Sequence, residues 1–228
     1  MALIKEPYGL VRNTDGTLCT TYRDDVVPFR GVRSFAVETA TTNLVTNSPQ
    51  NLQSIILQYP GAEITTELVT SGNLAGWAKI HITKVGDLQC IFRFQDMSVP
   101  QQADNTTRTY AIDFINPYPE LYLYLTGSLD VGNLNKISNI RYAKTWTNNT
   151  GTNKGLNIYV KSTLPAGTTG SWDVYARNYQ IEQKPFASSF VVGSRPSGRL
   201  VIPVEDLKFD IANDDWVISY WKYPVATQ

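Results

Sequence analysis

Short runs in which apolar and polar residues alternate recur through the middle of this 228-residue chain and constrain its fold more than any other feature. The runs cover residues 77–82, 91–94, 110–115, 121–125, 156–160, 172–176 and 179–182. Because successive side chains of a β-strand point to opposite faces of a sheet, this period of two predicts strands. Turn-forming Gly, Asn, Ser and Thr separate the runs, and the sequence shows no long amphipathic helix or internal repeat. We therefore expect an all-β fold, a jelly-roll β-sandwich.

The distribution of turn-forming residues and alternating runs divides the chain into three segments. Residues 1–38 mix polar turns with short apolar pieces and predict an extended N-terminal docking arm with a hairpin around Asp15-Gly16. Residues 39–190 contain the alternating runs and predict the sandwich. Residues 191–228 begin as a linker and predict a C-terminal β segment with an aromatic strand at 216–221. An exposed strand of that kind pairs readily with another chain, so we expect a homo-oligomer.

The charge balance argues against a nucleic-acid partner. Lys plus Arg number 20 and Asp plus Glu number 20, so the formal net charge is zero, whereas nucleic-acid binding needs a surplus of positive charge. No stretch approaches the ~18 apolar residues of a membrane span, and the first residues lack the pattern of a secretory signal. We therefore expect a soluble protein that is made in a cytoplasm, without membrane insertion.

Few residues are available for catalysis or for a metal. His81 is the single histidine, and it alternates with Ile80 and Ile82, so it should lie on the outer face of a strand. No GxSxG sequence and no phosphate-binding glycine loop is present. Cys19 and Cys90 are far apart in sequence and read as free, buried thiols. We expect no catalytic residue, no metal site and no cofactor.

Two arrangements of acidic residues were weighed against this expectation. Asp113 and Asp173 lie centrally in predicted strands and would face each other if those strands were neighbours, as a glycosidase pair requires. Structural calcium would fit Asp24-Asp25 or Asn213-Asp214-Asp215, but neither has the ligand spacing of a calcium loop. Solvated strand faces and turns are the favoured interpretations of these residues.

Aromatic residues supply the strongest candidate binding site. In the run 121–125 the leucines occupy one face, which leaves Tyr122 and Tyr124 on the other, about 6.6–7 Å apart along the strand. This spacing is near the repeat of adjacent sugar rings, whose apolar faces stack on aromatic side chains. The further candidates for glycan contact are Trp77, Trp146, Tyr142 and Trp172. Alternatively, the tyrosines cover the second face of the sheet or form a subunit interface, where tyrosine is enriched.

Two segments frame the predicted sandwich. In Tyr179-Gln180-Ile181-Glu182 the first and third side chains should point to the core, and Phe186 should plug the end of the barrel. In Thr42-Asn43-Leu44-Val45-Thr46-Asn47 the asparagines should hydrogen-bond neighbouring backbone at a turn.

These framing segments resemble a known class of domain. Residues 40–47, ATTNLVTN, resemble the opening of carbohydrate-binding-module-like jelly rolls. Residues 179–190, YQIEQKPFASSF, resemble the segment that closes similar jelly rolls in phage and prophage tail, fibre and minor structural proteins. Gly193-Ser194-Arg195 and the aromatic strand at 216–221 resemble the transition to a concanavalin-like lectin segment in those proteins.

The resemblance implies a non-enzymatic virion structural or attachment protein located in the virion. Its partners would be other virion proteins and copies of itself, with a trimer the favoured order, and its jelly roll would bind host-surface polysaccharide. The alternative is a carbohydrate-binding module of a secreted or cell-wall glycan-active protein. A β-sandwich glycosidase or lyase is the third interpretation, and it ranks last because the residues for catalysis are lacking.

Overall fold

The computed structural model describes residues 4–6, 9–12, 18–21, 27–29, 32–34, 40–46, 52–59, 62–84, 90–137, 139–165, 169–188, 190–195 and 199–201. The chain forms two compact units, one made of Met1–Thr41 and Arg195–Gln228 and the other of Thr42–Ser194. The calcium candidates at 24–25 and 213–215 and the aromatic strand at 216–221 lie outside the described residues. Neither described helix, both short 3-10 turns, is long or apolar enough to cross a membrane.

The described residues of the first unit form three small antiparallel pairs of strands. They are β1 (Ile4–Glu6) with β19 (Arg199–Val201), β2 (Gly9–Arg12) with β3 (Leu18–Thr21), and β4 (Val27–Phe29) with β5 (Val32–Ser34). Arg12 lies opposite Leu18, so the predicted hairpin around Asp15-Gly16 is confirmed by the strands on either side of it. The pairing of β1 with β19 joins the first and last parts of the chain within one unit.

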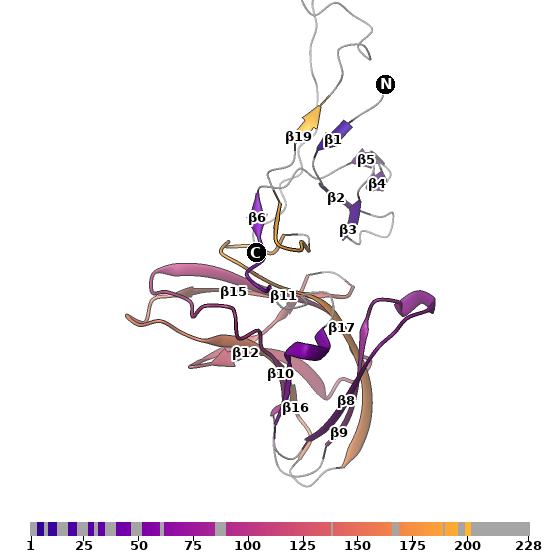
Figure 1. Cartoon of the computed structure of the whole chain (residues 1–228), viewed down its shortest axis with the longest axis vertical. Helices are drawn as coiled ribbons and strands as arrows, with labels where there is room; N and C mark the ends of the chain where they lie inside the picture. Colours follow the sequence, from indigo (N-terminus) through magenta and orange to yellow (C-terminus); the bar gives the residue numbers. More distant parts are fainter. Residues whose placement is uncertain are drawn as a thin grey trace, which may run out of the picture. The chain divides into compact units, whose positions relative to one another are not determined.

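The second unit is a sandwich of two antiparallel sheets (Figure 1). The five-stranded sheet has the order β13 (Asp130–Asn133), β12 (Leu121–Gly127), β16 (Leu156–Ser162), β10 (Cys90–Phe94) and β7 (Ile56–Gln58). The six-stranded sheet has the order β14 (Asn135–Lys136), β15 (Arg141–Asn148), β11 (Thr106–Ile115), β17 (Gly170–Glu182), β9 (Ala78–Lys84) and β8 (Ala62–Leu68). The remaining elements are β6 (Thr41–Thr42), paired with β18 (Ser194–Arg195), and the 3-10 turns η1 (Leu52–Ile55) and η2 (Gly72–Leu74). The expected all-β jelly-roll sandwich is confirmed.

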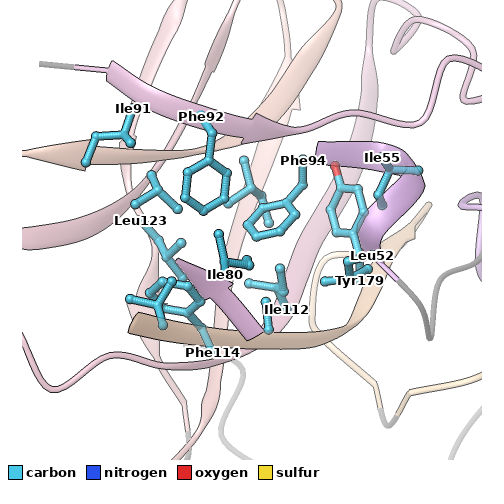
Figure 2. Close-up of a cluster of buried hydrophobic side chains, with 14 of the residues drawn as sticks. Leu52, Ile55, Ile80, Ile91, Phe92, Phe94, Ile112, Phe114, Leu123 and Tyr179 are labelled. Carbon is cyan, nitrogen blue, oxygen red and sulfur yellow. The ribbon is translucent and has the colours of Figure 1, made fainter. Parts of the chain in front are cut away.

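The core of the sandwich is filled by the inward-facing residues of both sheets (Figure 2). Phe92 and Phe94 of β10 are fully buried, and their rings meet edge to face with centroids 5.3 Å apart. Tyr179 of β17 packs against Phe94 at 6.1 Å, and Ile181 is buried two residues further on. The inward orientation that the alternation predicts for Tyr179 and Ile181 is therefore confirmed. Each side chain of this size contributes about 1.5–3 kcal/mol when it is fully buried.

The two framing segments of the sequence meet in the structure through Asn43. Its Nδ2 donates to the carbonyl oxygens of Tyr179 and Val191, and its Oδ1 accepts from the backbone N–H groups of Val45 and Ile181. The predicted bonding of this asparagine to neighbouring backbone is confirmed, and it also reaches across to β17. Phe186 is 38% exposed, so the prediction that it plugs the barrel end is wrong.

A bulge in β17 shapes the outer face of the six-stranded sheet. The register with β11 shifts between Ala111 and Asp113, and Asn178 sits at the shift with a φ of 57°. The extra residue brings both Arg177 and Asn178 to Asp113: Nδ2 of Asn178 donates to its carboxylate at 2.8 Å. Arg141 completes the cluster, 3.0 Å from the same carboxylate.

Candidate functional site

The outer face of the five-stranded sheet carries the site, beginning with two tyrosines of β12. The leucines of this strand are buried, and Tyr122 and Tyr124 between them are half-buried on the opposite face, as the alternation predicts. Their ring centroids are 6.3 Å apart with the ring planes at 80°. A flat apolar ligand can therefore stack on one ring while the edge of the other contacts it.

The register of the sheet places further side chains in line with Tyr124. Tyr124 lies opposite Tyr159 of β16, which lies opposite Arg93 of β10, and Arg93 lies opposite Leu57 of β7. Residues directly opposite one another on antiparallel strands share a face of the sheet, so these four form one row. Leu57 is 41% exposed at the end of the row, which keeps that end apolar and open.

Arg93 holds two tyrosines of this face in fixed positions. Its Nη1 donates to Oη of Tyr59 at 2.9 Å and to Oη of Tyr159 at 3.0 Å, and Oη of Tyr59 donates to Oη of Tyr159 at 2.9 Å. The guanidinium also lies 5.6 and 5.8 Å from the centroids of the two rings, within cation–π distance. Burial raises the pKa of Tyr59 to about 12, so its hydroxyl stays protonated near neutral pH.

A second cation lies beside the tyrosines of β12. Lys161 is opposite Tyr122, and its Nζ is 3.8 Å from the centroid of the Tyr124 ring. Among the described residues, no carboxylate lies within 4.0 Å of Lys161 or Arg93. We call this surface the tyrosine face; it consists of Tyr59, Arg93, Tyr122, Tyr124 and Lys161, with Tyr159, which is only 6% exposed, supporting them.

The structure separates the other aromatic candidates from the tyrosine face. Trp77 is only 3% exposed, so its burial closes it to a ligand, and the guanidinium of Arg177 lies 4.3 Å from its ring. Tyr142 and Trp146 belong to β15 of the other sheet and pack against the core. Trp172 is buried, and its Nε1 donates to Glu120. The candidate site therefore retains Tyr122 and Tyr124 from the sequence-based set.

Four residues of the tyrosine face were not predicted from the sequence. Arg93 and Tyr159 belong to predicted strands, and the alternation of apolar and polar residues predicts that their side chains point outward. What the sequence lacked was the register that sets β12, β16 and β10 side by side. Tyr59 follows the short strand β7, which gave no alternating signal, and Lys161 follows the predicted run 156–160 by one residue.

A separate polar cluster lies on the outer face of the six-stranded sheet. Nδ1 of His81 is 2.8 Å from Oδ1 of Asp173, and its Nε2 is 3.3 Å from Oγ of Ser171. A histidine that contacts a carboxylate through one ring nitrogen and a serine through the other is also found in serine hydrolases. The predicted outward orientation of His81 is confirmed, since its side chain is 45% exposed. Nζ of Lys79 also lies 3.3 Å from Oδ2 of Asp173, so this carboxylate is shared between an imidazole and an ammonium group.

The structure does not form the pair of Asp113 and Asp173 that was the less favoured interpretation, and the favoured interpretation of a solvated residue is wrong for Asp113, which is 7% exposed. Both strands lie in one sheet, but Asp113 is opposite Arg177 and Asp173 is opposite His81. The two carboxylates are thus displaced along β17 by about four residues, or about 13 Å, which exceeds the separation in glycosidases. Across the described residues, no three His, Cys, Asp or Glu side chains come together as metal ligands.

No protein-family model matches the sequence, and no curated protein matches it. Among solved structures, the chain is similar to the CBM22-1 xylan-binding domain of Paenibacillus barcinonensis Xyn10C, with 9% identity, a TM-score of 0.39, and coverage of 65% of this chain and 95% of that one. It is also similar to the CBM22-1–GH10 modules of Clostridium thermocellum endo-1,4-β-D-xylanase 10B in complex with xylohexaose, with 7% identity and a TM-score of 0.37. That match covers 65% of this chain and 28% of the xylanase chain. Likenesses this weak carry no argument about the ligand of this chain.

Proposed function

We propose that the sandwich is a non-enzymatic carbohydrate-binding module and that the tyrosine face is where it contacts a polysaccharide. The observation that carries the proposal is the pair Tyr122 and Tyr124, half-buried side by side on the outer face with ring centroids 6.3 Å apart. This separation suits contact with neighbouring sugar rings. Arg93 fixes Tyr159 and Tyr59 beside them, so little side-chain entropy is lost when a ligand binds.

The polar groups around the tyrosines match what sugar hydroxyls require. Asn133 lies opposite Tyr124 on β13, and Asn157 lies on β16 with the same outward phase as Tyr159. Amide side chains both donate and accept hydrogen bonds, as hydroxyl groups do. The face thus combines apolar ring surfaces with amides at its margin, the composition typical of sites that bind polar ligands by stacking.

Affinity electrophoresis through gels containing soluble plant, bacterial and capsular polysaccharides tests the proposal. The wild-type protein should be retarded by at least one polymer, and Tyr122→Ala/Tyr124→Ala should migrate freely in that gel. Tyr175→Ala is the matched control, because Tyr175 is a half-buried tyrosine on the outer face of the other sheet. Retardation that survives the double substitution would remove the tyrosine face from the proposal, and the tyrosines would then be assigned to an interface.

The non-enzymatic part of the proposal has its own test, because Ser171, His81 and Asp173 have the contact order of a hydrolase. These residues lie on an open sheet face, and none of them lines the pocket that is formed by residues after β10 and at the start of β16. A fluorophosphonate probe should leave Ser171 unlabelled, and incubation with a retarding polysaccharide should release no reducing ends. Labelling at Ser171 or release of sugar would overturn the assignment.

The finer part of the proposal is that the module belongs to a virion attachment protein that contacts other virion proteins and self-associates, with a trimer the favoured order. It is supported by the resemblance of the segments 40–47 and 179–190 to phage and prophage structural proteins. Light scattering on the full chain should give the mass of an oligomer. A strict monomer, or neighbouring genes that encode secreted glycan-active enzymes, would favour a module of a cell-wall or secreted protein instead.

A further inference from the structure

A pocket of about 280 Å³ lies beside the tyrosine face, between the connection that follows β10, the middle of β11 and the start of β16. Its lining includes Asn157, which shares the outward phase of Tyr159 two residues further along β16. Gln95, two residues after Arg93, lines it as well. Tyr110 and Ile181 are core residues of the six-stranded sheet, and Arg108 shares the inward phase of Tyr110, so the pocket lies at one end of the sandwich, between the sheets. Gln95 and Asn157 connect its rim to the tyrosine face.

Two buried polar groups at this pocket lack a partner among the described residues. Arg108 is only 7% exposed; its Nη1 donates to the carbonyl oxygen of Pro100 at 2.7 Å, but its Nε has no acceptor. The Nε2 group of Gln95 donates to Sδ of Met97, and its buried Oε1 has no donor. Buried groups of this kind normally have partners. One donor and one acceptor, on two residues that line this pocket, thus have no partner among the described residues.

The charges around the pocket favour an anion. Arg108 and Lys154 are both part of the lining, and Asp96 is the one acidic residue in it. The carboxylate of Asp96 accepts from the backbone N–H groups of Thr46 and Ser98 and from the hydroxyl of Ser98. These three donors stabilise the charge of Asp96 within the loop. The groups left to meet a ligand are a guanidinium N–H, an ammonium and an amide oxygen.

We propose that this pocket binds a sugar acid, with its carboxylate on Nε of Arg108 and a neighbouring hydroxyl on Oε1 of Gln95. A hydroxy acid supplies the acceptor and the donor that the two side chains lack, and its negative charge suits Arg108 and Lys154. The choice of a sugar acid over other hydroxy acids rests on the proposed function, because the pocket adjoins the tyrosine face. The module would accordingly select acidic polysaccharides, one uronic acid residue entering the pocket while its neighbours contact the tyrosines.

Nuclear magnetic resonance tests the proposal on the unmodified protein. The side-chain Nε–H signal of Arg108, assigned by its loss in Arg108→Lys, should shift saturably with sodium D-glucuronate. D-glucose should bind at least about tenfold more weakly, because a hydrogen bond to a charged group is about twice as strong as a neutral one. No shift with glucuronate, or equal shifts with both sugars, would overturn the proposal. Sodium acetate binding as tightly as glucuronate would overturn the role of Gln95.

Variants at the margin of the pocket provide a second measurement that does not disturb the bonds of Arg108. Lys154→Gln should weaken glucuronate binding several-fold and lower its salt dependence, since the side chain of Lys154 forms no ion pair within the described part of the chain. Gln95→Met should weaken glucuronate more than acetate. Unchanged binding in both variants would contradict the assignment.

The two proposals fail separately. In Tyr122→Ala/Tyr124→Ala the Arg108 signal should still respond to glucuronate, although polysaccharide retardation is lost. A glucuronate response without retardation by any polymer would retain the pocket and reject the tyrosine face. Retardation by neutral polymers alone, without a glucuronate response, would retain the tyrosine face and reject the acid pocket.

Discussion

Nη1 of Arg141 lies 3.0 Å from Oδ1 of Asp113, and both side chains are at most a tenth exposed. Arg177 approaches the other oxygen of the same carboxylate at 3.6 Å. A single buried carboxylate thus balances two guanidinium groups on the six-stranded sheet. Removing one member of such a cluster leaves a buried charge without compensation, which costs far more than the pair contributes.

We therefore expect Asp113→Asn to lower the free energy of unfolding by about 3 kcal/mol or more. Chemical denaturation followed by tryptophan fluorescence measures the change. Glu67→Gln serves as the control, because Glu67 is 69% exposed beside Lys79 and an exposed ion pair contributes about 1 kcal/mol or less. Equal effects of the two substitutions would show that the buried cluster is not the stabilising contact we describe.

A close approach of two backbone segments explains a glycine at the end of β12. A Cβ at Gly127 would overlap the carbonyl oxygen of Gly155, whereas a Cβ at Gly155 would find its nearest atom 3.8 Å away. Gly127→Ala should lower the free energy of unfolding by about 1–3 kcal/mol, because backbone atoms must shift to make room. Gly155→Ala should change it by about 0.5 kcal/mol or less. Denaturation midpoints that rank in the opposite order would contradict this packing.

The acid stability of the sandwich should depend on Asp173. The hydrogen bond from His81, with help from Lys79, holds the pKa of this carboxyl below its usual value of 3.8. A carboxyl whose pKa is lowered by folding stabilises the protein above its ordinary pKa, and that contribution is lost as the pH falls through the folded-state value. Asp173→Asn should therefore destabilise the protein at pH 7 and have no effect near pH 2. The difference should shrink in 1 M salt because the group is exposed, and a difference that persists at low pH would contradict the assignment.

The tyrosine face should be visible in an alkaline titration. Burial raises the pKa of Tyr59 to about 12, and the hydrogen bond to Tyr159 adds to the increase. Tyr159→Phe removes that hydrogen bond, so the pKa of Tyr59 should fall while remaining above 10.0, the value of a free tyrosine. Titration of the Cζ resonance in protein labelled at tyrosine provides the measurement. An unchanged pKa would mean that the two hydroxyl groups are not bonded in solution.

The sheets and their buried faces were predictable because alternation is a local property of the chain. The leucines of β12 point inward and its tyrosines point outward, as the run 121–125 indicates without any knowledge of neighbouring strands. The orientations of His81 and Tyr179 follow from the same rule. The alternation along each of these strands therefore predicts correctly which side chains point inward and which point outward.

The composition of the site was not predictable, because it depends on pairing between distant strands. Tyr124, Tyr159 and Arg93 come together through the order β12, β16, β10, which no local pattern encodes. The same gap explains why the neighbours of Asp113 and Asp173 could not be predicted, since the registers with β17 and β9 place Asp113 opposite Arg177 and Asp173 opposite His81. The burial of Trp77 beneath Arg177 is likewise a tertiary contact that no local pattern encodes.

The bonds of Asn43 have a mechanical consequence. The chain enters the sandwich at Thr42 and leaves it at Ser194, and Asn43 ties these ends together through the backbone of Tyr179, Ile181 and Val191. Tension applied through the two ends would load the pair of β6 with β18 and then the bonds of Asn43, before it reached the two sheets. A protein that grips a surface through its sheet face and is pulled through its ends would yield at these bonds before it released its ligand.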